Sequence, residues 1–113
     1  MNQAKLNTQL YQKMYAEQKL YRAGLLLMQP SEILNRAGEY VCRENILLSL
    51  EYNDLSSKQA LVLLNSVTPL TDICQKLERT GGGTSMEHIW NAVEAHANEV
   101  IRAKFIESRR DAR

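Results

Sequence analysis

The sequence predicts an all-α protein, an irregular bundle of four to five helices with two long helices near the termini. Apolar residues recur at helical spacing through most of the chain. Proline and hydroxyl-bearing residues stand where helices would begin, and no window alternates β-branched with polar residues as a strand does. Because 113 residues suit one core, we expect a single helical domain over 1–113.

The first long helix is predicted to run to about Met28. Its inward row consists of apolar residues at helical spacing, with Tyr11 and Tyr15 on a neighbouring row: Leu6, Leu10, Met14, Tyr21, Leu25 and Met28. The run Leu25–Met28 covers more than one side of the helix end. Either the shorter helices or a second copy of the chain would bury the additional apolar surface, and we slightly favour the second copy, in a homodimer.

A second helix is expected to begin at Pro30 or Ser31, because proline disfavours helical geometry in the preceding residue and suits a first helical turn. It ends around Tyr52-Asn53-Asp54. Gly38 is its weak point and marks either close packing or a bend. Its core row is predicted from apolar spacing: Ile33, Leu34, Ala37, Val41 and Leu48, with Leu47 beside it.

Two shorter helices follow. Ser56 and Gln59 have the spacing of a capping box, which predicts a helix from Ser57 to about Asn65. Thr68 as N-cap and Pro69 at the first helical position open the next helix. Its predicted inward residues are Leu70, Ile73, Cys74 and Leu77.

The last helix is long and follows Gly81-Gly82-Gly83, for which we expect a flexible linker over 80–84. Thr84 with Glu87 has capping-box spacing. The helix frays after Ser108, and its apolar row continues with helical period: Ile89, Trp90, Val93, Ala97, Val100, Ile101 and Phe105.

The composition indicates a protein of the reducing cytoplasm. Cys42 and Cys74 each lie in an apolar helical pattern without CxxC context, so buried free thiols are favoured over a disulfide. No apolar run approaches the ~20 residues that span a bilayer, so no membrane association is expected. The ends are basic and residues 29–55 are acidic, although the formal net charge is only +1. Attraction between these segments within the bundle is favoured over a surface that steers a partner.

No cofactor or metal motif is apparent. The triple glycine lacks the lysine and spacing of a phosphate-binding loop, and no strand precedes it. His88 and His96 are eight residues apart, whereas a shared metal on one helix needs a separation of four. We therefore expect neither a cofactor nor a metal site.

The densest polar constellation lies in the second helix and the turn after it. The candidate interaction face comprises Tyr40, Arg43, Glu44, Glu51, Tyr52, Asn53 and Asp54. Glu44 and Glu51 share a helix face and could do acid–base work if a pocket raised the pKa of one of them. The favoured interpretation is a polar stripe whose glutamates pair with lysines and arginines of the terminal helices.

Basic residues near both ends are candidate nucleic-acid contacts: Lys13, Lys19, Arg22, Arg109 and Arg110. Tyrosines interleave with the first three, as a surface that stacks single-stranded bases would need. The near-zero net charge and the absence of a helix-turn-helix signature keep this a minority hypothesis.

The stretch Glu39–Leu55 resembles a bacterial family of domains of unknown function, family 3848. The pattern extends to Tyr11–Met14, Pro30–Leu34, Gln59-Ala60, Leu63-Leu64, Ser66 and Pro69-Leu70, and thus to about Ile73. The segment Gln75–Glu87 departs from it. The resemblance implies small proteins of gut Firmicutes and their phages and conjugative elements, in accessory roles without a known activity.

The leading hypothesis is a small helical protein-binding or regulatory module rather than an enzyme. A mobile element would carry it to modulate a host machine such as a defence nuclease, in the manner of an anti-CRISPR protein. The alternatives are a nucleic-acid or nucleoprotein binder that uses the basic terminal helices, and an enzyme that uses Glu44 and Glu51.

Overall fold

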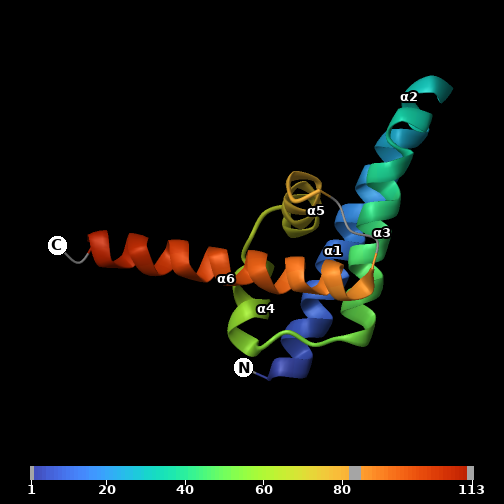
Figure 1. The fold of residues 1–113 in the computed structure, drawn as a ribbon. Helices are drawn as coiled ribbons and strands as arrows, with labels where there is room; N and C mark the ends of the chain where they lie inside the picture. Colours follow the sequence, from blue (N-terminus) through green and yellow to red (C-terminus); the bar gives the residue numbers. More distant parts are fainter. Residues whose placement is uncertain (1, 82–84, 112–113) are drawn as a thin grey trace.

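Six helices and no strand make up residues 2–81 and 85–111, the part of the chain that the computed structural model describes (Figure 1). They are α1 (Gln3–Leu26), α2 (Pro30–Asn35), α3 (Ala37–Tyr52), α4 (Ser57–Leu64), α5 (Pro69–Arg79) and α6 (Met86–Asp111). The predicted all-α fold with long helices at both ends is confirmed. The count rises to six because the helix predicted after Pro30 is divided in two.

One continuous apolar core joins α1, α3, α4, α5 and α6. The helices pack around it with α6 against α3, α4 and α5, and α1 against α3 and α4. The inward residues predicted for α5 are all buried. So are the N-terminal members of the row predicted for α1: Leu6, Leu10 and Met14.

Most of the core row predicted for the helix after Pro30 is wrong, although Leu47, predicted beside that row, is buried. Val41 is 55% exposed and Leu48 40%, and Leu34 on α2 is 75% exposed. The buried residues of α3 are Arg43, Ile46, Leu47 and Ser49. Two of these four are polar, so a search for apolar periodicity selects the opposite face of the helix.

The break between α2 and α3 falls at Arg36, whose φ of −104° and ψ of 4° leave the helical region. Asn35 and Gly38, both poor helix formers, flank it. A Cβ atom added at Gly38 would meet no atom within 4 Å, so close packing does not explain this glycine. The helix does bend, as the sequence suggested, but at Arg36, two residues before Gly38.

Local caps place several helix starts. The Ser56 hydroxyl accepts from Gln59 N at 3.1 Å and the Gln59 side chain accepts from Ser56 N at 3.0 Å, which confirms the predicted capping box of α4. The Ser85 hydroxyl accepts from His88 N at 3.1 Å at the start of α6. Thr84 of the other predicted capping box, and Gly82 and Gly83 of the predicted linker, lie outside the described residues.

The loop between α3 and α4 is fastened to α1 by the amide of Asn7. This amide donates to Leu55 O and accepts from Leu55 N, each at 2.9 Å, and Gln3 also donates to Leu55 O. Leu55 itself is fully buried. A loop residue thus enters the core with its backbone groups satisfied by polar side chains.

The C-terminal half of α6 projects beyond the core (Figure 1). The helix continues past Ser108, where its end was predicted, to Asp111. Phe105, predicted to face inward, is 61% exposed because no other helix extends that far. Within residues 2–81 and 85–111, no helix combines the length and apolar character needed to cross a membrane.

Candidate functional site

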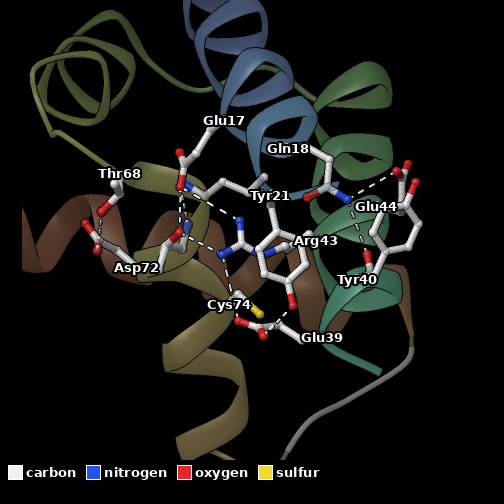
Figure 2. Close-up of polar contacts among 12 residues, drawn as sticks. Glu17, Gln18, Tyr21, Glu39, Tyr40, Arg43, Glu44, Thr68, Asp72 and Cys74 are labelled. Atoms are coloured by element: carbon white, nitrogen blue, oxygen red, sulfur yellow. Dashed lines mark hydrogen bonds and ion pairs between the residues drawn. The ribbon is translucent and has the colours of Figure 1, made fainter. Parts of the chain in front are cut away.

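Arg43, predicted to lie on a surface, is buried with only 4% of its area exposed. Its Nη2 donates to Thr71 Oγ1 at 2.8 Å, and the guanidinium stacks 4.0 Å above the ring of Tyr21. Glu17 lies 3.9 Å from Nη1 and Glu39 3.8 Å from Nη2. Figure 2 shows Arg43 at the centre of this cluster. The residues come from α1, α3 and α5, so Arg43 joins three helices.

Glu17 caps α5 from a different helix. Its carboxylate accepts from Leu70 N at 3.0 Å, from Thr71 N at 2.8 Å and from Thr71 Oγ1 at 2.7 Å. Thr68 occupies the predicted N-cap position, but its hydroxyl pairs with Asp72 at 3.3 Å and makes no capping bond within the described residues. A carboxylate on α1 therefore performs the capping that the sequence assigned to a threonine.

Two members of the Arg43 cluster, Arg43 and Tyr21, hold their protons firmly. An arginine keeps its charge in proteins. Burial, together with the hydrogen bond from Tyr21 Oη to Glu39 at 2.6 Å, raises the pKa of Tyr21 to about 12. The Nε and Nη1 atoms of Arg43 have no hydrogen-bond partner in the described part of the chain. These groups connect α1, α3 and α5.

Four residues with metal-ligand chemistry adjoin Arg43: Glu39, Cys42, Cys74 and Glu78. Both cysteines are free, as predicted; Cys42 is half-buried and Cys74 buried. Burial raises the pKa of each thiol. Cys74 Sγ also donates to Glu78 at 3.9 Å. The two cysteines lie 32 positions apart in the sequence, so no local spacing signals this cluster.

The polar stripe of α3 faces α1, but within the described residues Glu44 and Glu51 do not pair with basic residues. Glu44 accepts from Gln18 at 3.2 Å, and its hydrogen bond with the Tyr40 phenol raises the pKa of that phenol. Glu51 accepts from Tyr11 at 2.7 Å, which raises the pKa of Tyr11 to about 12. Among the described residues, the predicted ion pairs from these glutamates to the terminal helices are absent, and uncharged donors take their place.

Glu44 and Glu51 line one shallow hollow of 210 Å³ beside Tyr11 and Tyr15. Of the remaining candidate face, Tyr52 is 78% exposed, and Asn53 and Asp54 begin the loop after α3. Asn53 donates to Ser49 O at 2.9 Å. The structure thus leaves most of this face on the surface and moves Arg43 into the interior.

Lys13 on α1 binds the end of α4 and the loop that follows it. Its ammonium donates to two backbone carbonyl oxygens at the end of α4, those of Leu64 and Ser66. The Leu64 carbonyl is one of the last four of α4, which have no partner in their own helix, and a cation there also complements the helix dipole. The Lys13 ammonium is thus used within the fold, and its contact with nucleic acid stays a prediction.

The other predicted nucleic-acid contacts are dispersed. Lys19 lies over the Tyr15 ring at 5.7 Å, and Arg22 lines an apolar groove further along α1. Arg109 lies near the end of the projecting half of α6 (Figure 1). The side chain of Arg110 lies outside the described residues. The placed residues do not form one continuous basic surface.

His96 on α6 is half-buried, and both of its ring nitrogens lack hydrogen-bond partners within the described residues. Burial lowers the pKa of His96. The carboxylates of Asp72 and Glu99 oppose this effect, whereas Lys76 and Arg79 add to it. The histidine therefore stays neutral at physiological pH and resists protonation in the folded state.

An apolar groove of 350 Å³ opens on the arm formed by the end of α1, α2 and the start of α3. In Figure 1 this arm extends away from α4, α5 and α6. Large aliphatic side chains are exposed along it, with Leu27 at 89% and Leu26 at 67%. The groove is lined by Leu25, Leu26, Ile33, Ala37 and Val41, with Arg22 and Tyr40 as its polar members.

Residues 6–101 match the model of a family described as protein of unknown function (DUF3848). The predicted family resemblance is thereby confirmed. The match continues beyond Ile73 and includes Gln75–Glu87, the stretch expected to depart from the family. No curated protein and no solved structure matches the chain.

Proposed function

This chain belongs to the DUF3848 family of proteins of unknown function, and we propose that it acts by binding another protein. The observation that carries the proposal is the apolar groove on the arm. Soluble proteins rarely leave large contiguous apolar patches open to water unless the patch binds something. Here the shorter helices leave Leu26, Leu27 and Leu34 largely exposed rather than covering them.

The groove favours an amphipathic helix of the partner. Aliphatic side chains spaced three and four residues apart on such a helix can enter a groove built from two helices. Arg22 is the charged residue in the lining, so the matching helix would carry a carboxylate beside its apolar face. A second copy of this chain is the competing occupant, which a dimeric mass by light scattering would reveal.

Two Val→Asp variants test the groove. Val41 lines it, whereas Val67, which is 88% exposed between α4 and α5, supplies the same substitution at a distance. The tagged full chain and both variants are used for affinity capture from a host lysate, with nuclease treatment and a salt series. Circular dichroism checks that each variant is folded.

We expect a partner that withstands nuclease and salt, is retained by Val67→Asp, and binds Val41→Asp at least about 30-fold more weakly, the effect typical of an interface hot spot. Equal capture by the two variants would refute the groove as the binding surface. The partner's identity would also test the wider hypothesis that a mobile element uses this module against a host machine such as a defence nuclease.

Nucleic-acid binding is the second candidate function, through Lys13, Lys19, Arg22, Arg109 and Arg110. Phosphate contacts release counterions, so such binding weakens steeply with salt, whereas an apolar interface does not. Loss of every captured partner on nuclease treatment would favour this alternative. An enzyme using Glu44 and Glu51 is a third hypothesis, and a Glu44→Gln variant that keeps every measured property would count against it.

A further inference from the structure

α3 and α5 each carry one thiol and one carboxylate on a face of the helix near their contact. On α3, Glu39 and Cys42 are three residues apart; on α5, Cys74 and Glu78 are four apart. Both separations place side chains on one face of a helix. α3 and α5 pack against each other, so the two pairs face one another across the contact.

The ligand atoms of this cluster are already close together. One oxygen of Glu39, the sulfur of Cys74 and one oxygen of Glu78 all lie within 4.8 Å of one another. Cys42 is not among these close atoms; it lies one helical turn from Glu39 on α3 and is half-buried. Around a tetrahedral zinc ion, thiolate sulfur and carboxylate oxygen lie about 2.0–2.3 Å from the metal, so ligand atoms are about 3.3–3.8 Å apart. Binding would therefore draw these three ligand atoms closer together and turn the Cys42 side chain toward them.

The surroundings orient Glu39 as a ligand. Tyr21 donates to one of its oxygens at 2.6 Å, and Arg43 lies 3.8 Å from the other. A carboxylate has about four lone-pair sites, so both oxygens retain capacity for a cation. Metal-binding side chains are commonly held by such outer hydrogen bonds. Figure 2 shows Glu39 reaching toward Cys74 while it contacts Arg43 and Tyr21.

We propose that Glu39, Cys42, Cys74 and Glu78 form a binding site for a thiophilic divalent cation, of which Zn²⁺ is the best match. Binding forms four metal–ligand bonds, two to sulfur and two to oxygen, and releases the two thiol protons to solvent. The ligands then carry four negative charges, of which the cation neutralises two. The adjacent Arg43 guanidinium offsets part of the remainder.

The site would fasten α3 to α5. All four positions of a tetrahedral ion would be filled by protein, which is the pattern of a structural zinc site rather than a catalytic one. Glu78 is exposed, so the ion can enter from solvent. The proposal does not depend on the proposed function, because the arm groove is lined by different residues.

The test uses the full chain, kept reduced by a phosphine and titrated with Co²⁺, whose thiolate complexes absorb in the near ultraviolet. We expect one Co²⁺ per chain, with absorption that Zn²⁺ removes by competition. Cys42→Ser and Cys74→Ser should each abolish most of the absorption. Glu78→Gln should weaken Co²⁺ binding at least tenfold, while Glu107→Gln, a matched change on exposed α6, should not.

Further readouts keep the test decisive. Zn²⁺ should protect both cysteines from alkylation and release about two protons per ion near neutral pH. Tyr21→Phe should weaken binding about tenfold by freeing Glu39. Absence of thiolate absorption in the unaltered chain would overturn the proposal. So would unchanged affinity in Glu78→Gln, an exposed position where loss of folding is not expected, or a stoichiometry of one metal per two chains.

Discussion

Replacing Glu17 with alanine removes two functions of one carboxylate. It deletes the cap on Leu70 N and Thr71 N, which costs about 1 kcal/mol for a typical helix cap. It also takes a carboxylate from the buried Arg43. Removal of one partner from a buried ion pair costs about 3–5 kcal/mol. Because Arg43 keeps its contact with Glu39, we take about 2 kcal/mol for the loss of the ion pair. Together with the lost cap, Glu17→Ala should lower the free energy of unfolding by about 3 kcal/mol.

Urea unfolding followed by circular dichroism measures this change, which corresponds to a fall in melting temperature on the order of 10 °C for a domain of this size. Glu107→Ala, on the exposed part of α6, is the control and should stay within about 0.5 kcal/mol. Arg43→Met in the Glu17→Ala background should cost much less than it does alone, since the two residues interact. A Glu17→Ala effect no larger than that of the control, or additive effects in the double variant, would refute the capping and ion-pair argument.

Three further changes probe other contacts. Ser56→Ala removes half of a capping box and should lower the free energy of unfolding by about 1 kcal/mol, measured by urea unfolding; no change would mean that the cap is dispensable. Lys13→Met removes bonds from an ammonium to two carbonyls and should cost about 1.5 kcal/mol without altering nucleic-acid affinity in a gel-shift assay; reduced affinity with intact stability would support its nucleic-acid role. Burial lowers the pKa of His96, so the unfolded chain binds more protons and stability falls as pH drops through about 6.5. His96→Leu should therefore flatten the stability profile between about pH 7 and pH 5, whereas the control His88→Gln should keep its slope; equal slopes in both would contradict the assignment.

The helices that the sequence predicted well are those whose start signals are local. Ser56 and Gln59 satisfy each other's backbone groups within one turn, so their spacing alone specifies the capping box. Pro69 restricts its own backbone in the same local way. The inward row of α5 was also found, because its buried residues are apolar except for one thiol.

The row predicted for α3 failed for a physical reason. Arg43 and Ser49 are buried beside polar partners: Glu17 and Thr71 contact the arginine, and Ile46 O accepts from the serine hydroxyl. Hydrophobic periodicity counts such residues as outward-facing. The partners of Arg43 lie 26 and 28 positions away, and only tertiary packing brings them together.

The sequence alone determined an all-α chain with long terminal helices, two short helices with identifiable starts, free cysteines and membership of a family without known activity. Tertiary structure decided which side of α3 faces inward, which carboxylate caps α5, and which thiols and carboxylates meet between those helices. Capping and helical spacing act over three or four residues and are visible in a linear sequence. Contacts between helices depend on their packing angle and rotation, which no local pattern records.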